Sequence, residues 1–125
     1  MLDTSVVIGP PSDIGDHVVR GVVSTVTLAE LAFGIQRSDP VRAVSRQRRY
    51  EQALAWYEPL AFTEPQARIY GALCDALRLA GRNPRGRRFD LMIAAAATHL
   101  GLPLITRNPA DFEGLHESLR VIGVS

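Results

Sequence analysis

The chain has 125 residues, within the common size range of one domain, and we expect a single domain over residues 1–125. With 46% hydrophobic residues and a net charge of +1, its composition excludes a disordered protein, and no apolar run reaches the ~18 residues that cross a bilayer. All 14 basic residues are arginine, which excludes a P-loop lysine and Schiff-base chemistry, and the single cysteine, Cys74, excludes an internal disulfide.

The N-terminal part of the chain predicts two strands and the start of a helix. Residues 1–2 form a short strand that runs into Asp3, and residues 22–26 are a mostly β-branched run typical of a buried strand. Thr27 followed by Glu30 has the form of a capping box, so we expect the first long helix to begin at Thr27.

The central part predicts two amphipathic helices. Apolar residues recur at helical spacing over residues 43–57 and again over 65–80, where Gly81 supplies the stop signal. Residues 60–62 between them are a plausible short strand, and a basic loop follows over residues 82–88.

The C-terminal part predicts one more helix and two strands. Residues 90–100 are apolar nearly all round, as expected of a helix packed tightly on a sheet, and residues 104–106 and 119–121 have strand character. Strands separated by helices favour a parallel three-layer α/β domain.

Four acidic residues follow predicted strands or open predicted helices: Asp3, Glu30, Asp90 and Asp111. In an open parallel sheet such positions converge on one crevice. Carboxylates gathered in one pocket need cations, and hard oxygen ligands favour magnesium or manganese over zinc. Such a site would support metal-assisted hydrolysis of a phosphodiester bond. Each carboxylate also has a plain structural interpretation, as a capping residue or a charge that favours a helix N-terminus.

Clustered arginines precede the third of these acids. Arg82, Arg85, Arg87 and Arg88 lie within seven residues that contain no acid, and such a run is either a solvated loop or a phosphate-binding surface. A second basic stretch, residues 42–49, lies on a predicted amphipathic helix, and we interpret it as a solvated face or partner surface.

The order of four motifs resembles a known family. The stretches are Leu2-Asp3-Thr4-Ser5-Val6, Thr27-Leu28-Ala29-Glu30-Leu31, Asp90-Leu91-Met92-Ile93-Ala94-Ala95-Ala96-Ala97 and Thr106-Arg107-Asn108-Pro109-Ala110-Asp111-Phe112. They resemble the successive signatures of PIN domains, especially the VapC toxins of toxin–antitoxin pairs, over essentially the whole chain.

The resemblance implies a PIN-like α/β/α domain with a central parallel sheet and the activity of a toxin endoribonuclease dependent on Mg²⁺ or Mn²⁺. It implies that Asp3, Glu30 and Asp90 are the core carboxylates, with the fourth position filled by Asp111, which we favour, or by Asn108. The remaining implied roles are auxiliary hydroxyls and nucleic-acid contacts: Thr4, Ser5 and Thr106 for the former, and Arg82, Arg85, Arg87, Arg88 and Arg107 for the latter.

The resemblance also implies partners. These are a cognate VapB-like antitoxin, an RNA substrate (transfer or ribosomal RNA) and a second copy of the chain in a homodimer. The N-terminus carries no secretory signal, so we expect a cytoplasmic protein. Relatives usually extend the first strand ahead of the Leu-Asp-Thr motif, whereas here only Met1 and Leu2 precede Asp3, so we expect either an earlier start codon or a weakened site.

Two alternatives stay open at this stage. A catalytically weak PIN-like module would bind RNA or a protein in an arginine-dependent, salt-sensitive and metal-independent way. A receiver-type signalling domain also gathers acids at strand ends, but such domains normally require a lysine beside them, and the chain has none.

Overall fold

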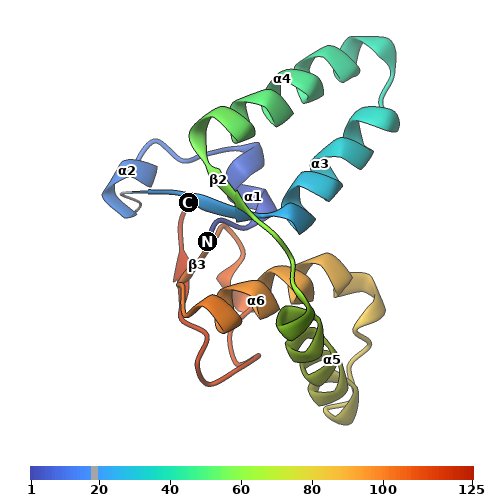
Figure 1. Ribbon diagram of the computed structural model, residues 1–125, viewed down its shortest axis with the longest axis vertical. Helices are drawn as coiled ribbons and strands as arrows, with labels where there is room; N and C mark the ends of the chain where they lie inside the picture. Colours follow the sequence, from blue (N-terminus) through green and yellow to red (C-terminus); the bar gives the residue numbers. More distant parts are fainter. Residues whose placement is uncertain (18–19) are drawn as a thin grey trace.

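The computed structural model describes residues 1–17 and 20–125 as helices packed around short parallel strands (Figure 1). The helices are α1 (Thr4–Ile8), α2 (Ile14–His17), α3 (Thr25–Gln36), α4 (Pro40–Trp56), α5 (Glu64–Leu79) and α6 (Arg88–Leu100), with 3₁₀ turns η1 (Arg85–Arg87) and η2 (Pro109–Asp111). The strands are β1 (Val22–Ser24), β2 (Glu58–Leu60), β3 (Leu104–Thr106) and β4 (Val121–Gly123).

The chain start joins two pairs of parallel strands. β1 pairs with β2 and β3 pairs with β4, each in parallel. The Leu2 amide donates to the Val22 carbonyl (2.9 Å), while the Ile105 amide donates to Met1 and the Asp3 amide donates to Ile105 (both 2.9 Å). The predicted parallel sheet is therefore confirmed, and even the short segment before Asp3 is held by hydrogen bonds on both sides.

Alternating residues of this sheet enter two separate hydrophobic cores. Met1 and Leu104 belong to a core built mainly with α5 and α6, whereas Leu2 and Ile105 belong to a core built with α1, α3 and α4. This period of two is the expected behaviour of strands whose two faces are both covered. The helices thus lie on both sides of the strands, in the α/β arrangement that the sequence predicts.

The start of α3 differs from the prediction. β1 ends at Ser24, whose side chain accepts a hydrogen bond from the Val26 amide (3.1 Å) and so caps the helix. Thr27 lies inside the helix and is fully buried, so the predicted capping box of Thr27 and Glu30 is wrong. β-Branched Val26 suits a strand, but a serine two residues earlier satisfies the first free amides of the helix.

Other element ends move by at most three residues: the helices predicted at residues 43–57 and 65–80 are α4 at Pro40–Trp56 and α5 at Glu64–Leu79. The strand predicted at residues 60–62 is β2 at Glu58–Leu60, and the one predicted at 119–121 is β4 at Val121–Gly123. α6 begins at Arg88 rather than at residue 90. The stop after α5 is confirmed, because Gly81 has φ +78° and the Arg82 amide returns to the Leu77 carbonyl (2.9 Å).

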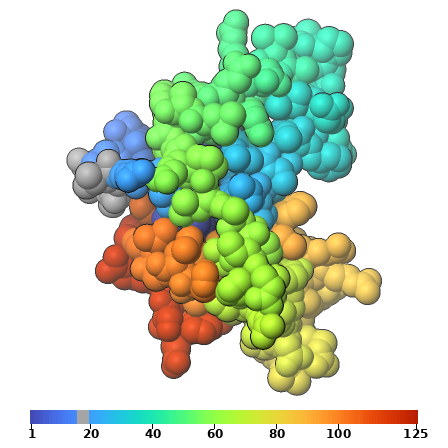
Figure 2. Space-filling model, viewed as in Figure 1, coloured from blue at the N-terminus to red at the C-terminus, as the bar shows by residue number. Residues whose placement is uncertain are grey.

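α3 and α4 pack side by side and project from the rest of the molecule (top of Figure 1). In the space-filling view an indentation separates this pair from the chain that leads into α6 (Figure 2). Among the described residues, no helix has both the length and the apolar composition needed to cross a membrane.

Candidate active site

Asp3 lies at the end of the first extended segment and is almost fully buried, with 3% of its surface exposed. It occupies the N-cap position of α1, yet its side chain makes no capping hydrogen bond. Instead its Oδ2 accepts hydrogen bonds from Ser5 Oγ (2.7 Å) and from Thr106 Oγ1 (2.9 Å). The carboxylate is therefore held by two hydroxyls, and helix capping does not explain its presence.

Glu30 lies in the second turn of α3 and is half-buried. Its Oε1 accepts a hydrogen bond from Thr4 Oγ1 (2.7 Å). Burial raises the pKa of Glu30, the Thr4 hydrogen bond lowers it in part, and the charges of Asp90 and Asp3 raise it again. The negative charges of Asp3 and Asp90 therefore oppose ionisation of Glu30.

Asp90 lies in the first turn of α6 and is also half-buried. Burial raises its pKa, as does the charge of Asp3, while the Arg87 guanidinium lowers it and Asp111 raises it again. The charges of Asp3 and Asp111 therefore act on Asp90, and those of Asp3 and Asp90 act on Glu30, although the four acids belong to four separate segments.

The two candidates for the fourth position are both exposed. Asp111 ends η2, and its charge reaches Asp90. Asn108 contacts the site through its backbone, because its amide donates to Thr106 Oγ1 (3.0 Å).

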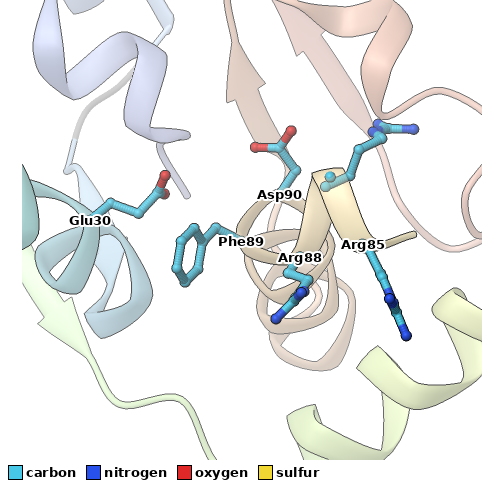
Figure 3. A pocket seen from close by; sticks show the side chains of 7 residues that line it. Glu30, Arg85, Arg88, Phe89 and Asp90 are labelled. Carbon is cyan, nitrogen blue, oxygen red and sulfur yellow. The ribbon is translucent and has the colours of Figure 1, made fainter. Parts of the chain in front are cut away.

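Glu30 and Asp90 line one pocket of about 440 Å³ between α3 and the N-terminus of α6, together with Arg85, Gly86, Arg87, Arg88 and Phe89. Figure 3 shows the two carboxylates directed into the gap between the helices, with the Phe89 ring beside it. Arg85 and Arg88 point away from the carboxylates. We call the part of the pocket at Glu30 and Asp90 its acidic end and the part lined by the arginines its basic end.

The predicted basic residues separate into three groups. Arg85, Arg87 and Arg88 line the acidic pocket, and the terminal nitrogens of Arg87 are buried without a hydrogen-bond partner in the described part of the chain. Arg82 instead lines two other hollows beside α5. Arg107 donates to the Gly9 carbonyl and so ties the end of α1 to the loop after β3.

Sequence reasoning missed two contributions to this region. Arg46 and Arg49, interpreted as a solvated or partner-facing stretch, are half-buried and line a second pocket of about 350 Å³ that also contains Thr4 and Glu30. Their spacing of three places them on one helix face, which separates them from exposed Arg48. Exposed Arg42 lies on the same face one turn earlier, so spacing alone does not identify the pair. Phe89 was the other omission.

The side chains at the acidic end suit a divalent cation. They supply only oxygen donors, and they raise one another's pKa, which a bound cation would offset. Within residues 1–17 and 20–125, no three acidic, histidine or cysteine side chains already form a metal cage. Mg²⁺ retains several waters and often uses only one or two carboxylates, so a preformed cage is not required.

Comparisons with known proteins agree over nearly the whole chain. The PIN domain family model matches residues 1–115, a range that contains all four acids. Ribonuclease VapC5 of Mycobacterium tuberculosis (strain ATCC 25618 / H37Rv) is 34% identical over 119 residues, covering 92% of this chain and 86% of that protein.

Two solved structures extend this similarity to the fold. A member of the VapBC family of toxin–antitoxin systems, VapBC-5 from Mycobacterium tuberculosis, superposes with a TM-score of 0.80 at 31% identity, covering 98% of this chain and 96% of that one. DNA-bound VapBC from Salmonella typhimurium superposes with a TM-score of 0.79 at 26% identity, with the same coverage.

Proposed function

The chain belongs to the PIN domain family, and we propose that it is the toxin endoribonuclease of a VapBC-type toxin–antitoxin pair. The observation that carries this proposal is that Glu30 and Asp90, which are remote in sequence, line one pocket, where the charge of Asp3 acts on both and that of Asp111 acts on Asp90. We take residues 1–125 as one PIN domain that meets its RNA substrate in the cytoplasm.

The acids would hold Mg²⁺ or Mn²⁺. When bound, such an ion supplies Lewis-acid activation of the phosphodiester and of the attacking water. Ser5 and Thr106 both donate to Oδ2 of Asp3, which leaves Oδ1 as the oxygen available to a ligand. Thr4 orients Glu30 in the same way through Oε1. These hydroxyls fix carboxylates that would otherwise turn away from one another.

The arginines at the other end of the pocket would bind the phosphates of the RNA. Arg85 and Arg88 are exposed and line the pocket, so they are placed to neutralise a strand that approaches the acids. Arg87 lies deeper and balances the charge of Asp90. Arg107 is committed to Gly9, so we assign it to support of α1.

A VapB-like antitoxin is the proposed protein partner, because the similar structures are complexes of VapBC systems. We also propose that the chain forms a homodimer. Expression alone should arrest growth, and co-expression of the partner should restore it. Asp3→Ala should abolish the arrest without loss of the folded protein.

The nuclease assignment is tested by one matched pair of variants. Asp90→Asn should lower Mg²⁺-dependent RNA cleavage by more than about 100-fold, beyond the roughly 10–100-fold effect of residues that only orient ligands. Asp75→Asn is the control, since Asp75 is exposed on α5 and paired with Arg78. Measured initial rates that are equal for wild type and Asp90→Asn, or RNA binding that never leads to cleavage with any divalent ion, would sink the proposal.

A further inference from the structure

Phe89 is an aromatic residue on the surface of the acidic pocket. It lies one residue before Asp90 in the first turn of α6, and 47% of its surface is exposed. Its ring stands between α3 and α6, beside the gap into which Glu30 and Asp90 point (Figure 3). Because the ring does not enter the hydrophobic core, the packing of the described residues does not account for it.

The surroundings of this ring contain both acidic and basic side chains. Phe89 lines the same pocket as Glu30, Asp90, Arg85 and Arg88. In Figure 3 its ring lies between Glu30 on one side and the start of α6, with Asp90 and Arg88, on the other. A flat apolar surface flanked by arginines is the combination that binds single-stranded nucleic acid, through base stacking and phosphate contacts.

We propose that Phe89 stacks on an unpaired base of the RNA, next to the phosphodiester bond held at the acidic end. This inference rests on the proposed nuclease function and adds a base-contacting residue to it. Bases inside a continuous duplex are stacked on both faces and cannot reach the ring, so Phe89 can contact only a base that is unpaired. Arg85 and Arg88 then bind the phosphates that continue from that base.

The proposal is tested by RNA binding in the presence of EDTA, which separates binding from cleavage. The probe is a short fluorescein-labelled single-stranded RNA of mixed sequence, measured by fluorescence anisotropy at fixed salt. Phe89→Ala should weaken binding by about 5- to 100-fold, since each stacked base contributes on that scale. Phe89→Trp should retain binding, whereas Phe89→Leu, which keeps apolar bulk without a ring, should resemble Phe89→Ala.

Phe33→Ala is the matched control. Phe33 is 60% exposed on α3, with its ring under Arg37 and outside the acidic pocket, so its loss should leave RNA binding unchanged. Circular dichroism of each variant checks that a loss of binding is not a loss of fold.

A second probe isolates the base itself. A strand of the same length with every base removed keeps its phosphates but offers no face for stacking. Wild type should bind the base-free strand as weakly as Phe89→Ala binds the intact strand. Phe89→Ala should bind both strands equally.

The possible outcomes separate the two hypotheses. Equal binding of the intact strand by wild type and Phe89→Ala overturns the stacking proposal alone. The same holds if Phe89→Ala weakens binding of the intact strand and of the base-free strand by the same factor. Absence of RNA binding and cleavage by wild type overturns the nuclease proposal and this one together.

Discussion

Hydroxyl groups determine which carboxylate oxygens of the acidic pocket remain for a ligand. Ser5 and Thr106 both use Oδ2 of Asp3, and Thr4 uses Oε1 of Glu30. Thr106 is fully buried, and its hydroxyl also accepts a hydrogen bond from the Asn108 amide. The hydroxyl therefore links Asp3 to the loop after β3. Such outer contacts normally fix the orientation of metal-binding groups.

Loss of the Thr106 hydroxyl should therefore weaken the site without removing any of its acids. Thr106→Val is expected to lower RNA cleavage by about 10- to 100-fold and to raise the Mg²⁺ concentration needed for half-maximal rate, because Asp3 loses a hydrogen bond. Thr106→Ser should stay close to wild type. Initial rates measured across a Mg²⁺ titration provide the check.

The control for this substitution is Thr98→Val. Thr98 bonds only back to the Ala94 carbonyl within α6, so its replacement should leave the rate unchanged. If Thr106→Val cleaves RNA as fast as wild type at every Mg²⁺ concentration, Thr106 has no part in orienting Asp3.

Glu30→Gln should raise stability while it removes activity. Burial first, and then the charges of Asp90 and Asp3, raise the pKa of Glu30 against the lowering effect of Thr4. A carboxyl with a raised pKa in the folded state binds its proton more tightly there than in the unfolded state. The free energy of unfolding therefore falls as pH rises from the unfolded-state pKa through the folded-state pKa of Glu30. In EDTA, the melting temperature of Glu30→Gln should exceed that of wild type at pH 7.

The same linkage fixes the pH dependence. The difference in melting temperature between Glu30→Gln and wild type should vanish below about pH 4.5, the ordinary pKa of glutamate, because the carboxyl is then protonated in the folded and the unfolded state. Glu64 is exposed on α5 and paired with Arg68, so Glu64→Gln should not raise the melting temperature. A wild-type melting temperature at or above that of Glu30→Gln at pH 7 would show that folding does not raise the pKa of Glu30.

At the scale of elements, the pairing of β1 with β2 depends on close packing between the residue before β1 and the end of α4. Gly21 comes directly before β1, and its carbonyl accepts a hydrogen bond from the Glu58 amide that begins β2 (3.0 Å). A Cβ at this position would lie 2.5 Å from a ring carbon of Tyr57 and 3.4 Å from Leu2. The glycine therefore lets the end of α4 pack against the sheet.

Two glycine-to-alanine substitutions should change stability in opposite directions. Gly21→Ala should lower the free energy of unfolding by about 1–3 kcal/mol, because the added methyl displaces Tyr57. Gly71→Ala, in the exposed interior of α5 with open space around it, should raise the same quantity by about 0.5–1 kcal/mol. Urea denaturation measures both, and a shift of the same sign in the two variants would contradict this account.

For the whole molecule, the site exists only in the folded state. Asp3, Glu30, Asp90 and Asp111 belong to different segments that the sheet and α6 hold together. The unfolded chain separates them, so a cation that needs several of these groups binds the folded state alone. Binding and folding are then thermodynamically linked.

Mg²⁺ should therefore raise the melting temperature. At a concentration a hundred times its Kd, the expected stabilisation is about 2.7 kcal/mol, or roughly 8–13 °C for a domain of this size. Differential scanning fluorimetry at matched ionic strength measures it. Asp90→Asn should show a much smaller rise, and an identical rise in both proteins would place the cation elsewhere.

The sequence by itself determined the fold class, the family and the order of the strands and the long helices, whereas the short helices α1 and α2 were not predicted. Strand and helix periodicities are local, and so is the stop at Gly81, whose left-handed φ follows from the residue type. The strand at Leu104–Thr106 was predicted with its observed bounds from the strand character of its three residues, all of which the structure buries. The four acids were candidates because each stands at the end or start of such an element.

The tertiary structure alone decided which side chains meet. Thr106 bonds Asp3 across 103 residues, Arg107 turns to Gly9, and Arg46 lines a pocket with Glu30. Strand ends also shifted, as at Glu58–Leu60, because parallel pairing with Val22–Ser24 selects the register. Side-chain direction and register depend on contacts between distant segments, and a local pattern carries no information about those contacts until the chain has folded.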